Sequence, residues 1–463
     1  MILASIVLTA MSFVQSLAPL PPLPSPRQVA WQDMETNAFV HFGPNTFTNV
    51  EWGGGKEDPN LFDPSDLDCD QWVRTLKQAG FKGVIITAKH HDGFCLWPSK
   101  QSTHTVAQSK WRGGKGDVLK DLSEACHKYG IKMGVYLSPW DRNHPAYGTP
   151  EYNKVFAAML TEVLTHYGPI FEVWFDGANG EGPNGKKQVY DWPLFISTVR
   201  KFQPNAVIFS DGGPDVRWVG NESGLASETC WSMIPANRYV PGTPYYSELG
   251  EGSEQGDSWV APECDVSIRP GWFYHPEEEP KVKTPAQLMD LYEKSVGRNS
   301  LLLLNVPPDR RGHFTDAEVS SLTGFHDLLK ATYGKDLANG ASIDYSSRHG
   351  DEFDPKKAGK GHELLWAPAP FDSTPHLTLN LRAPANFNRI VLGEPIAMGQ
   401  RVSAFHVEVS DSGSDWHLLA SGTTIGRKRI LAVDPTTASR VRVVIDSSRS
   451  TPVISEFGLY NEK

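Results

Sequence analysis

Strand-like and helix-like segments alternate through the first 335 residues of this 463-residue chain. Short apolar runs that end on polar residues alternate with longer amphipathic segments bounded by Gly, Pro, Ser or Asp. Strand followed by helix, repeated with short connections, predicts a parallel sheet with helices packed outside it. The strands are expected at 37–43, 83–87, 132–140, 171–177, 206–212 and 301–308, and the helices at 65–80, 116–129, 149–167, 192–202, 284–296 and 315–331.

Polar residues of these strands gather at the carboxyl ends. The first strand ends after His41, the second runs into His90 and His91, the third carries Tyr136, and the fourth delivers Asp176. The carboxyl ends of parallel strands meet at one face of a barrel, or at one edge of an open sheet. We therefore expect these side chains to lie close together.

The hydrophobic pattern changes near 335–345. Beyond this point apolar and polar residues alternate along segments separated by Gly, Asp and Ser turns, which is typical of an antiparallel β-sandwich. We therefore divide the chain into an α/β domain at 27–335 and a sandwich at 340–463. The sandwich strands are expected at 377–381, 389–392, 404–409 and 441–445.

Charge and composition exclude several classes of function. The formal net charge is −10 and no run of Lys and Arg stands out, so nucleic acid is not an expected partner. After the first 18 residues, no stretch is long and apolar enough to span a membrane. Five Cys without a C-x-x-C pair predict neither a disulfide scaffold nor a structural zinc site, but leave room for one or two bridges.

The amino-terminal residues 1–18 are apolar or small and carry no side-chain charge. Ser16, Leu17 and Ala18 offer small residues at the spacing that a signal peptidase requires, and a Pro-rich segment follows. The run is too short for a membrane anchor. We expect a cleaved signal peptide and a secreted protein.

Asp176 is the first candidate for chemistry. It follows a buried strand and precedes Gly177, so a single carboxylate is held at the rim of the sheet. Trp174 lies two residues earlier and shares its face. Glu51 and Trp52, in the loop after the first strand, would lie over the same mouth. A strand-end Asp often only caps the next turn, so its surroundings decide the interpretation.

The histidines also allow an interpretation as metal ligands. His41, His90, His91 and Asp176 together would suit a zinc or two-metal hydrolase site. The adjacent pair His90 and His91 disfavours it, because neighbours on a strand point to opposite faces. The spacings H-x-H and H-E-x-x-H are also absent. We therefore expect neither a metal nor another cofactor.

The chain has 14 Trp, and flat aromatic faces often hold sugars, although large enzymes also simply bury Trp. Cleavage of a glycosidic bond needs a second carboxylic acid to protonate the leaving oxygen. The loosely patterned stretch 213–280, expected to be a functional loop, offers two. Glu222 lies beside Trp218 in a Gly-flanked segment, and Glu263 lies among aromatic residues near Arg269. The residues alone do not rank these two acids.

At these positions the chain resembles the α-L-fucosidases of glycoside hydrolase family 29, in particular the subgroup of plant and bacterial α-1,3/4-fucosidases. The resemblance extends from Phe39 to Tyr460 and implies a (β/α)8-like catalytic barrel followed by a carbohydrate-binding-like β-sandwich. We expect the sandwich mainly to pack against the barrel. The segments that carry the resemblance are 42–47, 88–94, 136–140, 173–177 and 299–307.

The resemblance implies retaining hydrolysis of terminal α-1,3- or α-1,4-linked L-fucose from oligosaccharides or glycoproteins, without a cofactor. Asp176 would attack the anomeric carbon, and Glu222 would protonate the leaving oxygen and then activate water, with Glu263 as the alternative acid. The expected fucose-binding residues are His41, Glu51, Trp52, His90, His91, Tyr136, Trp174, Arg217 and Trp272.

Asn221, Glu222 and Ser223 also form a glycosylation sequon. A glycan on Asn221 would crowd the proposed acid, so either this Asn is unmodified or the loop turns Glu222 inward and Asn221 away. Two other functions stay open on the same scaffold. One is a catalytically inactive fucose-binding lectin, and the other is a metal-dependent hydrolase that a chelator would inactivate.

Overall fold

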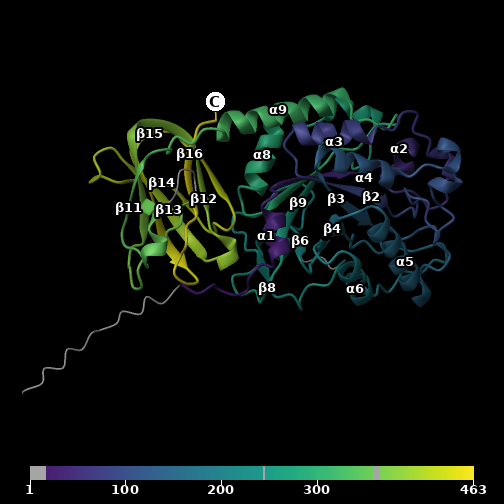
Figure 1. Cartoon of the computed structure of the whole chain (residues 1–463), viewed down its shortest axis with the longest axis horizontal. Helices are drawn as coiled ribbons and strands as arrows, with labels where there is room; N and C mark the ends of the chain where they lie inside the picture. Colours follow the sequence, from purple (N-terminus) through teal and green to yellow (C-terminus); the bar gives the residue numbers. More distant parts are fainter. Residues whose placement is uncertain (1–16, 243–245, 358–363, 463) are drawn as a thin grey trace, which may run out of the picture.

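The computed structural model describes residues 17–242, 246–357 and 364–462, so almost all of the predicted signal peptide at 1–18 lies outside the described residues. A barrel and a β-rich carboxyl-terminal domain lie side by side, and helix α9 runs along one edge of the barrel and ends beside the carboxyl-terminal domain (Figure 1). None of the helices in the described ranges is both long and apolar enough to cross a membrane.

Eight parallel strands close into a barrel in the order β1-β10-β9-β6-β5-β4-β3-β2. The expected (β/α)8-like architecture is thereby confirmed. Strands in such a barrel are covered on both faces, which explains their nearly continuous apolar runs. Their bounds are β1 Thr36–Val40, β2 Gly83–Lys89, β3 Lys132–Leu137, β4 Ile170–Trp174, β5 Val207–Ser210, β6 Val216–Trp218, β9 Ala261–Ser267 and β10 Leu301–Asn305.

The helices pack around the barrel and start and stop on recognisable residues. The side chain of Asp117 caps α4, and Gly130 ends it in the left-handed conformation with φ 68°. Thr315 and Glu318 form a reciprocal capping box at the start of α9. The bounds are α1 Pro26–Gln32, α2 Pro44–Thr48, α3 Cys69–Gln78, α4 Val118–Tyr129, α5 Pro150–His166, α6 Trp192–Phe202, α7 Tyr246–Glu251, α8 Pro285–Ser295 and α9 Asp316–Tyr333.

The stretch 213–280, predicted to be a long loop, contributes two barrel strands. Strand β6 is only three residues long. Strand β9 contains Pro262, Glu263 and Asp265, and all of its residues are buried. Polar residues that point into a barrel break the apolar pattern by which strands are recognised, so these two strands were missed. A short ribbon, β7 Met233–Ile234 with β8 Ser258–Trp259, lies between them in sequence.

Large side chains fill the barrel interior and form the floor of its carboxyl-terminal mouth. Phe39, Tyr136 and Trp174 belong to one buried cluster with Trp31 of α1. Trp31 comes from the first helix rather than from a strand, and it donates its indole N–H to Glu172 of β4. Helix α1 therefore contributes directly to the core beneath the mouth.

The carboxyl-terminal domain is an antiparallel sandwich with its own core. Its strands follow the order β11-β12-β15-β13-β14, with β16 paired to β12. Register shifts interrupt the long β12–β15 pairing, for example between Asn380 and Ala385. The bounds are β11 Ser342–Tyr345, β12 His376–Gly393, β13 Val402–Ser410, β14 His417–Gly422, β15 Arg429–Ser448 and β16 Glu456–Tyr460.

Barrel and sandwich share a buried interface. Val391, Ile430 and Tyr460 of the sandwich are part of the large core cluster of the barrel. Asn299 donates its amide N–H to the carbonyl of Cys230 at 2.9 Å and accepts the N–H of Arg427 at 2.7 Å. These contacts support the expectation that the sandwich packs against the barrel.

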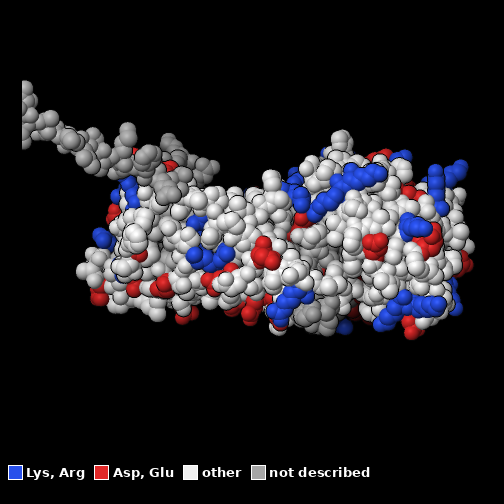
Figure 2. All heavy atoms as spheres, turned by 90° about the horizontal axis from the view of Figure 1, so that it is seen from below, with Lys and Arg blue, Asp and Glu red and all other residues white. Residues whose placement is uncertain are grey.

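Two further expectations from composition can be compared with the structure. All five Cys are buried free thiols, so the bridges for which the sequence left room are not formed. Lys and Arg are interspersed with Asp and Glu on the face seen in Figure 2, in keeping with the net charge of −10.

Candidate active site

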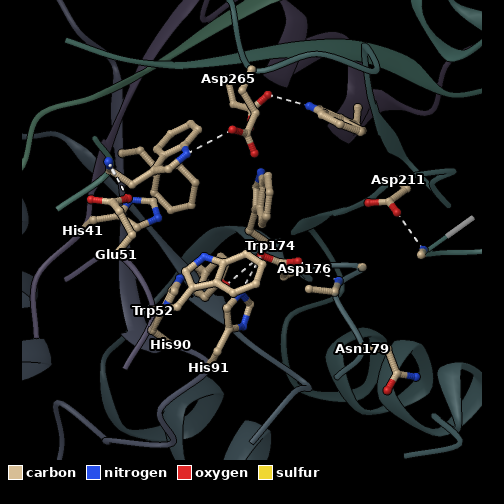
Figure 3. A pocket seen from close by; sticks show the side chains of 18 of the residues that line it. His41, Glu51, Trp52, His90, His91, Trp174, Asp176, Asn179, Asp211 and Asp265 are labelled. Atoms are coloured by element: carbon tan, nitrogen blue, oxygen red, sulfur yellow. Dashed lines mark hydrogen bonds and ion pairs between the residues drawn. The ribbon is translucent and has the colours of Figure 1, made fainter. Parts of the chain in front are cut away.

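A cavity of about 480 Å³ opens at the carboxyl ends of the barrel strands. In Figure 3 Asp176 lies near its centre, with His41 and Glu51 on one side and Asp211 and Asn179 on the other. Most of the side chains predicted from the sequence line this one cavity: His41, Glu51, Trp52, His90, His91, Tyr136, Trp174, Asp176, Glu222 and Trp272.

The Asp176 carboxylate is oriented through both of its oxygens. It lies two residues beyond the end of β4. Oδ2 accepts the hydroxyl of Tyr136 at 2.9 Å, and Oδ1 accepts the N–H of Ala178 at 2.7 Å. Burial and the charge of Asp176 raise the pKa of Tyr136 well above its ordinary value, so this hydroxyl stays protonated and donates. A carboxylate held in this way is fixed yet open to the cavity.

The hydrogen bonds of His41 determine its tautomer. Its Nδ1 lies 2.8 Å from Oδ1 of Asn305. The amide nitrogen of Asn305 donates to Ser267 and to the carbonyl of Trp272, so Oδ1 is an acceptor and His41 Nδ1 carries the proton. Burial lowers the pKa of His41 to about 4. At neutral pH its Nε2 is therefore an acceptor.

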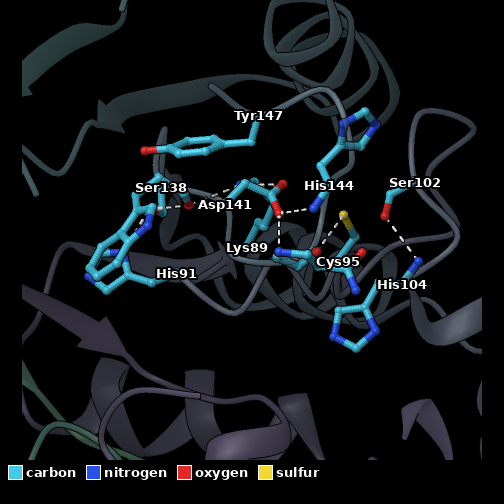
Figure 4. Close-up of polar contacts among 12 residues, drawn as sticks. Lys89, His91, Cys95, Ser102, His104, Ser138, Asp141, His144 and Tyr147 are labelled. Carbon is cyan, nitrogen blue, oxygen red and sulfur yellow. Dashed lines mark hydrogen bonds and ion pairs between the residues drawn. The ribbon is translucent and has the colours of Figure 1, made fainter. Parts of the chain in front are cut away.

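His91 is oriented in the same way. Ser138 donates its hydroxyl to the carbonyl of Trp140, so His91 Nδ1, at 2.7 Å from Ser138 Oγ, is the donor of that pair (Figure 4). Its Nε2 lies 3.8 Å from Asp176 Oδ2. Burial lowers the pKa of His91 to about 4, against the opposing charge of Asp176. Burial also lowers the pKa of His90, well below its ordinary value. The cavity therefore contains neutral imidazoles suited to accept hydrogen bonds from hydroxyl groups.

A buried ion pair supports the strand ends beneath these histidines. Lys89 Nζ lies 3.2 Å from Oδ2 of Asp141, and both side chains are almost completely buried. Burial opposes ionisation of Asp141, but the charge of Lys89 and the N–H groups of Asn143 and His144 outweigh it and lower its pKa. The pair joins the end of β2 to the loop after β3 (Figure 4), which fixes the segment that carries His90 and His91.

Glu222 presents a second carboxyl group to the same cavity. It lies in the loop after β6 and accepts the indole N–H of Trp272 at 3.2 Å. Desolvation by the cavity wall, followed by the charges of Asp176 and Glu51, raises its pKa above the ordinary value. The two carboxyl groups thus have different environments, one bound by two donors and one biased toward its protonated form.

Glu263 and Arg217 are not brought to the cavity. Glu263 is fully buried inside the barrel, where its Oε1 accepts the indole N–H of Trp174 at 2.8 Å. Arg217 is also fully buried, and its guanidinium donates to the carbonyls of Leu249 and Trp231 at 2.8 and 2.7 Å. Successive residues of a strand point to opposite faces. Val216 and Trp218 face the barrel interior, so Arg217 between them points outward. The expected cavity roles of these two residues therefore do not fit their positions.

Comparison with known proteins agrees with this arrangement. The family model for α-L-fucosidase matches residues 27–334. α-L-Fucosidase 1 of Arabidopsis thaliana is 46% identical over 455 residues, which cover 96% of this chain and 88% of that protein. The chain belongs to the α-L-fucosidases of glycoside hydrolase family 29. The model for the F5/8 type C domain matches residues 342–457 of the carboxyl-terminal sandwich.

Two solved structures are similar over nearly the whole fucosidase chain. A family 29 member from a rumen bacterium is 41% identical, covers 96% of this chain and 78% of that one, and superposes with a TM-score of 0.85. A family 29 fucosidase of Ruminococcus gnavus, solved in complex with fucose, is 34% identical, with 97% of each chain covered and a TM-score of 0.88.

Glu51 connects two loops at the rim of the fucosidase cavity. Its carboxylate accepts the N–H of Trp272 at 2.9 Å and the N–H of Phe273 at 3.2 Å, and it contacts His275 Nε2 at 2.6 Å. Trp272 is thereby held over His41, with ring centroids 5.1 Å apart. Glu51 thus positions the residues that follow β9, besides lining the cavity itself.

Sequence reasoning missed several residues that line the cavity. Asp211 directly follows β5 and accepts the N–H of Gly242 at 2.6 Å. Burial raises its pKa to about 6. Asp211 carries the same signal as Asp176, an apolar run that ends on Asp-Gly, and could have been found by it. The further missed residues are Phe39, Asn179, Lys187, Trp218, Asp265 and Phe273.

Asp265 could not be found because its strand was missed. It lies on β9, is 4% exposed, and accepts the indole N–H of Trp218 at 2.8 Å. Burial, followed by the charges of Glu222 and Glu263, raises the pKa of Asp265 well above its ordinary value. The surroundings of this carboxyl group in the wall of the cavity therefore favour its protonated form.

The glycosylation sequon lies in the loop that carries Glu222. Asn221 donates its amide N–H to the carbonyl of Leu225 at 2.9 Å and accepts the N–H of Ser223 at 3.1 Å. Its side chain is thus engaged within its own loop, and Glu222 reaches the cavity. Across the described ranges, no three His, Cys, Asp or Glu side chains are grouped so that they could hold a metal ion.

Proposed function

We propose that this protein is a retaining exo-α-L-fucosidase with Asp176 as nucleophile and Glu222 as acid/base. One observation carries the proposal: two carboxyl groups in different environments line a single cavity. Asp176 accepts two hydrogen bonds, whereas the surroundings of Glu222 raise its pKa. Such a division of environments assigns the acid and the nucleophile of a glycosidase.

In the first step Asp176 attacks the anomeric carbon of the fucosyl unit, and the bond to the leaving oxygen breaks. Glu222 transfers its proton to that oxygen, so the aglycone leaves as an alcohol. The product is an ester between Asp176 and fucose. The hydroxyl of Tyr136 keeps the attacking carboxylate in place but does not neutralise it.

In the second step Glu222, now ionised, removes a proton from water. The water oxygen attacks the anomeric carbon from the face that the aglycone left, and the ester to Asp176 breaks. Two inversions give net retention. The negative charge of Asp176 raises the pKa of Glu222, which favours protonated Glu222 before the first step. In the ester this charge is absent, so the pKa of Glu222 falls and Glu222 can act as a base in the second step.

Neutral imidazoles give the cavity its complementarity to a sugar. Nε2 of His41 and Nε2 of His91 accept hydrogen bonds from fucose hydroxyls, because each ring has its other nitrogen committed as a donor. Trp272 offers a flat face for the apolar side of the ring and its methyl group, and Trp174 lines the floor of the cavity. An enzyme that holds a single terminal fucose in this way acts in the exo mode.

We assign α-1,3 and α-1,4 linkages in oligosaccharides or glycoproteins as the substrate class. The assignment rests on the resemblance of the chain to the plant and bacterial α-1,3/4 subgroup. Asn179, Lys187 and Asp211 also line the cavity, and these polar groups suit a second sugar next to fucose. A panel of α-1,2-, α-1,3-, α-1,4- and α-1,6-fucosides tests the assignment, and turnover confined to the α-1,2 or α-1,6 compounds contradicts it.

Azide rescue separates the two catalytic roles. With an activated aryl fucoside, we expect Glu222→Ala to accumulate the ester, and azide to release it as α-L-fucosyl azide. Asp176→Ala should lose roughly 10⁴-fold or more in kcat, the scale seen when a nucleophile is removed, and give β-L-fucosyl azide. β-L-Fucosyl azide from Glu222→Ala, or unchanged turnover in Asp176→Ala, would overturn the assignment. Binding of fucose without any turnover by the wild type would favour the lectin.

We also propose that the protein is secreted after cleavage behind Ala18. The support is the uncharged apolar run at 1–18 and the small residues before the proposed cleavage point. Amino-terminal sequencing of protein from the medium of an expressing secretory host should begin at Pro19. Retention of residues 1–18 on a protein that stays inside the cells would contradict this proposal.

A further inference from the structure

Two glutamates lie inside the barrel below the floor of the fucose cavity. Glu172 comes from β4 and Glu263 from β9, and both side chains are fully buried. Each accepts one indole N–H: Trp31 Nε1 lies 2.7 Å from Glu172 Oε2, and Trp174 Nε1 lies 2.8 Å from Glu263 Oε1. Neither glutamate has an established role in the proposed reaction.

The remaining oxygens of the pair have no donor from elsewhere. Glu172 Oε1 and Glu263 Oε2 are buried, and no N–H or O–H group of another described residue reaches them. The two carboxyl groups instead act on each other inside the barrel, where each affects the pKa of the other. Two ionised carboxylates close together in a buried core would repel strongly. A single proton between them removes the repulsion and gives both oxygens a partner.

We propose that Glu172 and Glu263 share a proton at neutral pH and that this carboxyl pair is a positioning device for Trp174, the floor of the fucose cavity. The ring of Trp174 stacks on Phe209 with centroids 3.9 Å apart and on Tyr136 at 5.4 Å. Tyr136 in turn donates to Asp176. The catalytic consequence rests on the proposed role of Asp176, whereas the shared proton does not.

The electrostatic surroundings hold this proton through the neutral range. Burial raises the pKa of Glu172 to about 8, and burial followed by the charge of Glu172 raises the pKa of Glu263 well above its ordinary value. The other ionisable groups that act on the pair are Asp215, which raises the pKa of Glu172, and Asp265, on which Glu263 acts. Asp215 is itself paired with Arg27 and Arg200.

The shared proton has a measurable effect on stability. The folded protein keeps the one proton that the pair shares, whereas the unfolded chain releases it above about pH 4.5. Stability therefore falls as pH rises from there toward the folded pKa. One additional retained proton changes the unfolding equilibrium constant about tenfold per pH unit.

Glu263→Gln is the variant that tests the shared proton. Its amide oxygen can still accept from Trp174, and its N–H₂ group replaces the shared proton toward Glu172. Denaturant unfolding of the full chain between pH 5.5 and 7.5 should give a pH slope about one proton smaller in Glu263→Gln than in the wild type. Glu172→Gln should reduce the slope in the same way. Equal slopes in the wild type and both variants would overturn the shared proton.

Binding of L-fucose tests the positioning role without turnover. Above the pKa of the pair the wild type loses the shared proton, and repulsion between the two carboxylates should displace the Glu263 oxygen that accepts the Trp174 N–H, whereas the amide of Glu263→Gln stays in place. From pH 7 to pH 9.5 the Kd for fucose should rise at least about threefold more in the wild type than in Glu263→Gln. An identical rise in both proteins would contradict the positioning role. Because neither measurement needs catalysis, failure here is distinct from failure of the proposed reaction.

Discussion

At the scale of single residues, Asp176 and Glu222 show how the proposed nucleophile and the proposed acid, both carboxyl groups, differ in their surroundings. Tyr136 and the N–H of Ala178 stabilise negative charge on Asp176. Around Glu222 the cavity wall and neighbouring negative charges disfavour ionisation, and only the indole of Trp272 opposes them. The pKa of Glu222 therefore reflects a balance. Burial and the charges of Asp176 and Glu51 raise it, and the hydrogen bond from Trp272 lowers it.

This balance predicts the effect of Trp272→Phe on the pH profile. The indole N–H lowers the pKa of Glu222, so its removal should raise that pKa and move the alkaline limb of kcat/KM to higher pH. The phenyl ring keeps an aromatic face over His41. A profile measured with an aryl fucoside checks the shift, and a limb that stays in place or moves to lower pH argues against Glu222 as the acid.

The neutral histidines predict an acid limit for fucose binding. His41 and His91 have pKa values lowered to about 4, so protonation below that pH turns their acceptor nitrogens into donors. KM should rise below about pH 4, before kcat is affected in proportion. Between pH 6.5 and 4 the unfolded chain binds protons that the folded protein does not. The free energy of unfolding should therefore decrease as the pH falls from 6.5 to 4. A KM that is constant down to pH 3.5 would contradict neutral acceptors.

At the scale of elements, the loop after β4 is packed tightly against the loop after β5. A methyl group on Gly177 would collide with the Asp211 carboxylate and would lie 2.7 Å from the nitrogen of Gly242. Asp211 accepts that same N–H of Gly242. The turn that carries Asp176 therefore depends on a glycine at this point of close approach.

Gly177→Ala should consequently displace Asp176 and separate Asp211 from Gly242. We expect a loss of about 1–3 kcal/mol in the free energy of unfolding, the range for overpacking, together with reduced kcat. Gly43→Ala is a matched control near His41, because its added methyl group would meet only ordinary contacts at 3.9 Å. Denaturant unfolding and kinetics compare the two variants. Equal effects would show that Gly177 has no special role.

The sequence predicted elements where their pattern was simple. The strands that deliver His41, His90, Tyr136 and Asp176 have apolar runs and polar ends, and the barrel places them as expected. β6 and β9 were missed because one is short and the other carries buried carboxyl groups. Without β9 in the predicted fold, Glu263 remained a candidate for the cavity acid. The structure shows that it lies on β9 and points below Trp174.

At the scale of the whole molecule, the sandwich completes the core of the barrel. Val391, Ile430 and Tyr460 are buried against barrel residues, and Glu228 of the barrel pairs with Arg429 of the sandwich across the interface. These sandwich residues lie far from the cavity in sequence and do not line it. Their contribution to activity is therefore expected to act through stability.

Ending the chain at Lys335 should expose the barrel surface that these side chains cover. Each buried large apolar side chain stabilises by about 1.5–3 kcal/mol, so the barrel alone should unfold at clearly lower denaturant concentration. Its folded fraction should keep the kcat of the full chain. Circular dichroism and active-site titration measure both quantities. An unchanged midpoint, or a large loss of kcat in folded protein, would contradict a structural role for the sandwich.

Retention of configuration is the central claim for the reaction, and proton NMR tests it most directly. Hydrolysis of an aryl α-L-fucoside is followed from the first minutes, before mutarotation mixes the anomers. The account predicts that α-L-fucose appears first and that the β-anomer grows later. Initial release of β-L-fucose would show direct attack by water and would contradict a covalent intermediate on Asp176.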